Sequence, residues 1–245
     1  MRIIVAFLIP TAILAYILGL IDPGLWAKAG LNILNISRFI PLLGVRNDLW
    51  GDTLTAVYET LIISVFGVSS GVLIAYLLAP LASPLLAPRT IAIAGRILAN
   101  SARTVPAILW AILFVILVGP GAKAGALALA IYTSTYLAKF FYEALESVDR
   151  ELLDSLKAMG LRGYTLAFAL YTHIRRQIIS SVLFMLEYNV RTASILGFVG
   201  AGGVGYYILQ YLDILDYQAV LTFVIAAIAI VAAIDTTSYT LRTRI

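Results

Sequence analysis

The stretch DRELLDSLKAMGLRGYTLAFALYTHI, residues 149–174, is a polar and charged island between long apolar runs. It belongs to a chain of 245 residues that is 62% hydrophobic and only 12% charged, with a mean hydropathy of +0.98. Soluble domains are roughly 45–50% apolar and about 25% charged. The composition therefore predicts an integral membrane protein, and the island is expected to lie outside the bilayer.

A transmembrane helix needs about 20 mostly apolar residues, and the sequence offers about six such runs, which predicts an all-α membrane protein. The first run lacks a small-residue cleavage site followed by a soluble domain, so we read it as a retained span and not as a signal peptide. The predicted spans are residues 3–21, 54–78, 91–118 with a polar start, 124–141, 178–198 and 219–239.

Six spans place both termini on the same side of the membrane. Of the 17 Lys and Arg residues, 12 are counted on that side, including Arg96 and Arg103 in the polar start of the third span. Four are counted on the other side, and Arg191 is left within the fifth span. Because cytoplasmic loops carry the excess of basic residues, we predict that both termini and the island are cytoplasmic. The predicted parts are an N-terminal helix with an external interfacial segment (1–50), a transmembrane domain (51–240) containing a cytoplasmic loop (143–176), and a cytoplasmic tail (241–245).

The island itself has a helical pattern. Apolar residues recur on one face between Arg150 and Met159, and Gly160 follows as a helix-ending glycine does. A second short helix is predicted over residues 164–171. A solvated loop between two spans is the plain explanation, but a compact helix–Gly–helix is more ordered than a connection requires. The pattern favours a docking surface for a soluble partner.

The island also resembles a known loop. Its DSLKAMG, residues 154–160, is followed after nine residues by LYTH, residues 170–173. This spacing is similar to the cytoplasmic coupling loop of binding-protein-dependent ABC importer permeases, E-A-A-x3-G-x9-I-x-L-P. Asp154 stands in the place of the glutamate, and His173 in the place of the proline. Ser155 and Leu156 replace the alanines.

A second stretch, EYNVRTASILGFVGAGGVG at residues 187–205, carries a more specific resemblance. It resembles the fifth-span region of phosphonate/phosphite-type importer permeases, where N-V-R-x-A leads into G-x-V-G-A-G-G-x-G. The glycine element also occurs in methionine-type importer permeases. The substrate that the resemblance implies is phosphonate, phosphite or a related small oxyanion, and a methionine-type or other small-solute importer is the alternative.

The resemblance implies a type I ABC importer permease fold in the plasma membrane of a prokaryote, with no enzymatic activity, metal or nucleic acid of its own. It implies a homodimer or paired permease, an external substrate-binding protein, and two cytoplasmic ABC ATPase subunits that bind ATP and Mg. The contact with the ATPase would be made by Asp154, Ser155, Leu156, Lys157, Ala158, Met159 and Gly160.

Polar residues inside the predicted spans are candidates for the translocation pathway: Glu187, Asn189, Arg191 and Asp235. Charges in a span usually face a bundle interior or an aqueous path, and a guanidinium suits an oxyanion. We therefore hypothesise that Arg191, with Asn189 nearby, lines the anion path. Alternatively Glu187 and Arg191, four residues apart, pair with each other. Asp235 could bond to a neighbouring span or to Asn189.

The glycines Gly200, Gly202, Gly203 and Gly205 allow two interpretations. Successive backbone N–H groups can form a nest for an anion, but glycines in a span more often permit close helix contact or a break. We favour the second and predict an external gate here. No Lys-Ser/Thr follows the glycines, so they do not form a nucleotide-binding P-loop.

Two other classes of protein remain as alternatives. An intramembrane enzyme would have only Ser194 and His173 as nucleophile and base, about 20 residues or roughly 30 Å apart along a helix. A secondary transporter would be expected to show internal repeats or paired broken helices, which we do not find in the sequence. The chain has no Cys and one His, which makes a metal site a poor prediction.

Overall fold

The computed structural model describes Gly24 and residues 44–244, and every regular element in this part of the chain is helical. The predicted first span, residues 3–21, lies outside the described residues. The elements are η2 (Asn47–Leu49), α3 (Trp50–Ala82), α4 (Arg89–Thr104), α5 (Ala107–Val118), α6 (Ala122–Glu146), α7 (Arg150–Ala158), α8 (Gly163–His173), α9 (Arg175–Leu196), η3 (Gly197–Val199), α10 (Val204–Asp213) and α11 (Tyr217–Arg244).

Within the described residues, three helical stretches are long and apolar enough to cross a membrane: Asn47–Ala82, Arg175–Asp213 and Tyr217–Arg244. They contain the predicted spans 54–78, 178–198 and 219–239. A fourth span is present if the pair formed by α4 and α5 is counted as one. The structure therefore agrees with a multi-helix membrane protein over this part of the chain.

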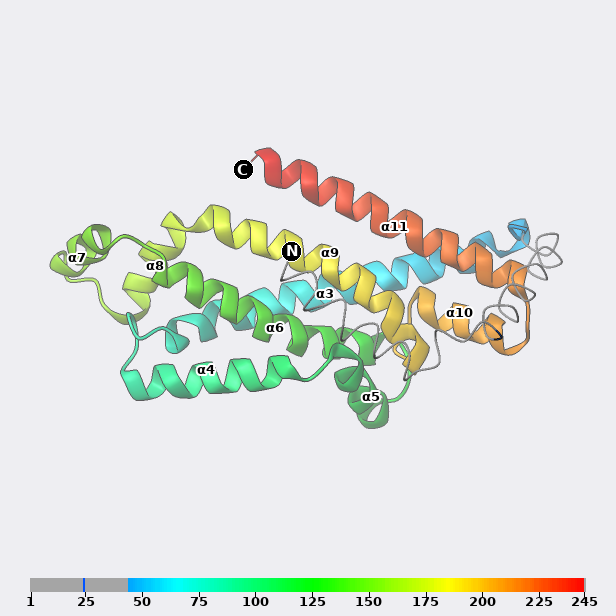
Figure 1. The fold of residues 1–245 in the computed structure, drawn as a ribbon, viewed down its shortest axis with the longest axis horizontal. Coiled ribbons are helices and arrows are strands. Elements are labelled where there is room, and N and C mark those ends of the chain that lie inside the picture. The colour runs from blue at the N-terminus through cyan, green and yellow to red at the C-terminus, as the bar shows by residue number, and fades with distance from the viewer. Residues whose placement is uncertain (1–23, 25–43, 245) are drawn as a thin grey trace. The chain divides into compact units, whose positions relative to one another are not determined.

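Helix α6 covers the predicted span 124–141 but does not have the apolar composition of a lipid-facing helix, since it contains Thr133, Ser134 and Thr135. These three residues are buried by neighbouring helices. In Figure 1, α6 runs along the bundle between α4 and α9, and it packs most extensively on α3. Protein surrounds α6, so it can carry hydroxyl side chains whose partners lie inside the bundle.

Small residues bring α3 and α6 into close contact. A Cβ atom on Gly67 would lie 2.6 Å from the Cβ of Leu129, and one on Gly71 would lie 2.7 Å from Cγ2 of Thr133. Helices in a membrane associate through such close packing, because lipid chains are as apolar as leucine side chains. The two glycines therefore fix the distance between the central helices.

The predicted third span, residues 91–118, is broken in the structure. Helices α4 and α5 meet at an angle of 85° around Val105 and Pro106. Proline lacks an N–H donor and disfavours helical geometry in the preceding residue, and Val105 accordingly has extended backbone angles (φ −78°, ψ 118°). The polar helix α4 is thus separated from the apolar helix α5.

Asn189 forms the most deeply buried polar contact between α9 and α6. Its side chain is fully buried, accepts a hydrogen bond from the Thr133 hydroxyl at 3.1 Å and donates one back to it at 2.8 Å. In a low-dielectric interior, a buried polar group without a partner is costly. The pair therefore fixes the rotation of α9 against α6.

Replacing Asn189 by alanine should lower the free energy of unfolding by about 2–3 kcal/mol, through a new cavity and an unpaired Thr133 hydroxyl. Thermal unfolding of the purified protein in detergent measures this loss. The double variant N189L/T133V, which removes both polar groups, should recover part of it. A double variant less stable than N189A would contradict the assignment.

Candidate functional site

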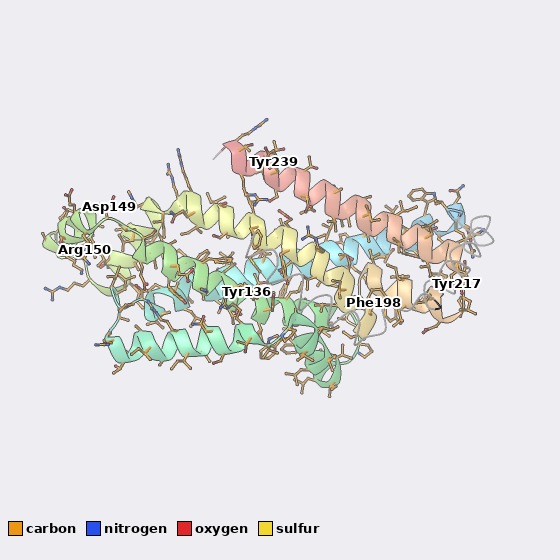
Figure 2. All side chains as sticks on the ribbon, in the orientation of Figure 1. Tyr136, Asp149, Arg150, Phe198, Tyr217 and Tyr239 are labelled. Atoms are coloured by element: carbon orange, nitrogen blue, oxygen red, sulfur yellow. The ribbon has the colours of Figure 1, made fainter. Side chains whose placement is uncertain are left out.

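The polar island forms two helices joined by a sharp turn. Helix α7 ends before Gly160, which has φ +86°, and its N–H donates to the Lys157 carbonyl at 3.0 Å. The N–H of Leu161 donates to the Leu156 carbonyl at 3.2 Å. This is the hydrogen-bonded glycine ending of a helix. The predicted helix–Gly–helix is confirmed, and Figure 2 shows Asp149 and Arg150 at one extreme of the bundle.

Helix α8 is held on the end of α3. Leu166 and Leu170 are buried, and the Tyr171 hydroxyl donates to the Tyr76 carbonyl at 2.9 Å while the two rings stack with centroids 4.1 Å apart. Burial raises the pKa of Tyr171, so its hydroxyl keeps its proton for this bond. The loop is therefore attached to α3, one of the helices long and apolar enough to cross a membrane.

Helix α7 by contrast presents most of the predicted coupling residues to the exterior. Leu153 is buried towards the bundle, Leu156 is half-buried and Met159 is 68% exposed. The exposed members of the predicted set are Asp154, Ser155, Lys157, Ala158, Met159 and Gly160. The geometry is thus compatible with a soluble partner binding this helix.

Four charged side chains, which we call the charge cluster, join α9 to α11: Glu187, Arg191, Asp235 and Arg242. Arg242 donates to Glu187 at 2.7 Å, and Arg191 contacts Asp235 at 3.3 Å. The predicted pair of Arg191 and Glu187 is the longest of these contacts, at 3.8 Å. Two positive and two negative groups make the charge cluster formally neutral.

Arg242 is the member that our reading of the sequence missed. A signal was present, because Asp235 and Arg242 are seven residues apart and share one face of a helix. Arg242 falls in the predicted cytoplasmic tail, residues 241–245. In the structure α11 continues to Arg244, and the Arg242 side chain reaches Glu187 on α9.

The structure corrects the expected proximity of Asn189 and Arg191. Two residues apart on a helix, their side chains point in directions about 160° apart, on nearly opposite faces. Asn189 lies in the interior against Thr133, whereas the Arg191 side chain is 51% exposed. Asp235 bonds to Arg191 and not to Asn189.

The glycine run forms a tight turn between η3 and α10. Gly200, Gly202 and Gly203 have φ values of +83°, +80° and +72°, which side chains with a Cβ rarely adopt. The N–H of Gly203 donates to the Glu59 carboxylate at 3.1 Å, and that of Val204 donates to the Thr60 hydroxyl at 2.9 Å. The turn is therefore fastened to α3.

The same turn contacts the start of α6. The N–H of Gly121 donates to the Gly200 carbonyl at 2.7 Å, and a Cβ on Gly202 would lie 2.7 Å from the Ala122 nitrogen. The Gly203 N–H already donates to Glu59, so it is not free to bind an anion in a backbone nest. The negative charge of the Glu59 carboxylate would also repel an anion at this place. The geometry favours close helix contact, and the gate stays a prediction.

Ser194 and His173 are not brought together. They lie towards opposite ends of α9, His173 just before its start and Ser194 in its last turn, where the Ser194 hydroxyl donates to the Val190 carbonyl at 3.2 Å. A nucleophile and a base must come within hydrogen-bond reach to act together. This pair therefore offers no acyl-transfer site.

Residues 71–245 match the family described as the binding-protein-dependent transport system inner membrane component. The chain belongs to this family. The permease is 33% identical over 186 residues to the phosphite transport system permease protein PtxC of Stutzerimonas stutzeri, covering 75% of this chain and 68% of that protein. It is 35% identical over 144 residues to the phosphate-import permease protein PhnE of Mycolicibacterium smegmatis, covering 58% of this chain and 27% of that protein.

Solved structures agree on the fold. The permease superposes with a TM-score of 0.71 on a chain of the MetNI methionine ABC transporter in an inward-facing conformation, covering 82% of this chain and 99% of that chain at 19% identity. The predicted family and the type I ABC importer permease fold are thereby confirmed. The cytoplasmic location of the termini stays a prediction.

Proposed function

We propose that this permease forms, with a second permease subunit, the translocation pathway of an ATP-driven importer for phosphite, phosphonate or a related small phosphorus oxyanion. The observation that carries the proposal is the 33% identity to a phosphite permease across 75% of the chain. The methionine-type alternative is supported by the shared glycine element and by a fold-level likeness at 19% identity. The complex would lie in the plasma membrane of a prokaryote, where an external binding protein delivers the substrate.

ATP and Mg would bind to a separate ATPase subunit that docks on α7. Two observations support this part of the proposal. The predicted coupling residues from Asp154 to Gly160 are exposed apart from Leu156, and α8 connects them firmly to α3. Closure of two ATPases around bound ATP would then move α3 and the helices packed on it.

Reconstitution tests the proposed substrate class. The permease would be purified with its cognate ATPase and binding protein and placed in liposomes containing ATP and Mg. We expect ATP-dependent uptake of labelled phosphite, methylphosphonate or phosphate, and no uptake of labelled methionine. Uptake of methionine without any phosphorus oxyanion would contradict the proposal and favour the alternative.

We further propose that the charge cluster forms part of the pathway wall and that it holds α9 against α11. Because Arg191 lies beside two carboxylates, its charge is compensated, and an arriving anion would have to displace Asp235 or Glu187. Arg191 therefore has the properties of a positioning residue in this arrangement. Glu187 and Asp235 share that role.

A double-mutant cycle tests this role. R191Q should lower uptake about tenfold, since coupling within such a pair is typically 0.5–3 kcal/mol. The double variant R191Q/D235N, which removes one charge of each sign, should recover most of the loss. If the double variant transports as poorly as R191Q while D235N alone is mild, the substrate uses the charge of Arg191 directly, and the positioning role is wrong.

A further inference from the structure

The polar face of α4 lies against α6, and Arg96 on this face is paired with a carboxylate. Arg96 donates to the Glu146 carboxylate at 2.5 Å and to the Ala82 carbonyl at 2.9 Å, and its guanidinium stands 5.0 Å from the centre of the Tyr142 ring. These contacts lie at the end of α6 that leads into the polar island. Arg96 has a structural role there.

Arg103 occupies the same face of α4 seven residues later, near the break at Pro106. Its guanidinium stands 5.3 Å from the centre of the Tyr136 ring, but among the described residues no carboxylate lies within 4 Å of it. Arg96, Arg191 and Arg242 each have such a carboxylate. The half-buried charge of Arg103 is thus left uncompensated within the described part of the permease.

A strip of tyrosines continues from Arg103 across the bundle: Tyr136 and Tyr132 on α6 and Tyr188 on α9. The rings of Tyr136 and Tyr132 are 4.7 Å apart, those of Tyr132 and Tyr188 are 5.8 Å apart, and the last two hydroxyls are 3.0 Å from each other. One proton makes the bond between these hydroxyls, so the other can be donated to an acceptor. Figure 2 shows Tyr136 midway between the two ends of the bundle.

Asn100, one turn before Arg103 on α4, supplies a second unsatisfied group. Its Oδ1 atom is buried and has no hydrogen-bond partner in the described structure. Buried polar atoms are nearly always hydrogen-bonded, so an exception calls for an explanation. A ligand that carries both a negative charge and a P–OH group would satisfy Arg103 and Asn100 together.

We propose that Arg103, Asn100 and the tyrosine strip form a transient binding site for a tetrahedral phosphorus oxyanion about midway along the helix bundle. The guanidinium supplies the charge and two parallel donors, the tyrosines supply neutral O–H groups, and the Asn100 carbonyl accepts from P–OH. A single uncompensated cation attracts the anion without holding it, as conduction requires. This inference rests on the proposed function and adds the residues that contact the substrate.

The test uses the complete importer in liposomes with labelled phosphite and methylphosphonate as probes. R103Q should lower uptake at least tenfold, whereas ATP hydrolysis stimulated by the loaded binding protein should stay within twofold of the wild type. R103K keeps the charge and should recover a substantial part of uptake. R89Q is the matched control, because Arg89 is an exposed arginine on the same helix, and it should transport like the wild type.

Three outcomes overturn the site. Uptake by R103Q at the wild-type rate would show that Arg103 is dispensable. A fall of uptake and ATP hydrolysis by the same factor, without recovery in R103K, would show that Arg103 is merely structural. Wild-type liposomes that take up no phosphorus oxyanion would overturn the proposed function and the site together. Wild-type uptake with an equally active R103Q would overturn the site alone.

Discussion

Replacing Gly160 by valine should abolish ATP-coupled uptake by an importer that is still inserted in the membrane. The residue has φ +86°, where an L-residue is strained by roughly 1–2 kcal/mol and a β-branched one by more. No atom lies within 4 Å of the position where a Cβ would be, so steric clash does not contribute. The strain would open the turn between α7 and α8 and move the proposed contact with the ATPase.

Uptake by G160V should fall to about a tenth or less of the wild-type rate, as a penalty above 1.4 kcal/mol implies. ATP hydrolysis by the assembled complex, measured beside uptake, should lose its dependence on the binding protein. G160N is the matched control, because asparagine tolerates the left-handed region, and it should retain most of the uptake. Normal coupled uptake by correctly inserted G160V would show that the turn has no part in coupling.

The second large effect is expected at Gly205, in the first turn of α10. A Cβ there would overlap the Ser194 carbonyl and would lie 3.1 Å from the Cα of Gly197. The obstacle is backbone on both sides, so rotation of a side chain cannot relieve it. Overpacking in a core lowers the free energy of unfolding by about 1–3 kcal/mol even where side chains can adjust. We expect G205A to lower it by more than this.

The yield of monodisperse protein from detergent extracts and its thermal midpoint measure this effect. G205A should give little folded protein, since the clash separates α9 from α10 where both contact α3. G51A is the matched control, because no atom lies within 4 Å of a Cβ at Gly51, in the first turn of α3. Equal stability of G205A and G51A would contradict the close backbone contact between Gly205 and Ser194.

Local patterns in the sequence were sufficient to predict the positions of the two island helices and of most of the spans. The predicted helices 150–159 and 164–171 lie within two residues of α7 and α8, because each depends on its own periodicity and on the ending at Gly160. The break near Pro106 had a local signal as well. The apolar run 106–118 masks this signal, because together with residues 91–105 it is long enough to predict one continuous span.

Local patterns could not predict which residues the candidate site residues contact. Gly203 bonds to Glu59, which is 144 positions away, and Asn189 bonds to Thr133, 56 positions away. Arg191 and Asp235 are 44 positions apart. A periodic pattern places a side chain on a face of its own helix, but the neighbour of that face depends on how the helices pack.

The sequence by itself determined that this is a membrane protein of helices, that it belongs to the ABC importer permeases, and that a short helix–Gly–helix interrupts its spans. Composition indicates the membrane class and periodicity indicates the helices, whereas the family follows from the resemblance of residues 187–205 to known permease motifs. Only the tertiary structure decided that, among the residues it describes, Arg191 has a compensating carboxylate and Arg103 does not. The compensation of a charge depends on which carboxylate lies within about 4 Å, and helix packing alone brings such distant residues together.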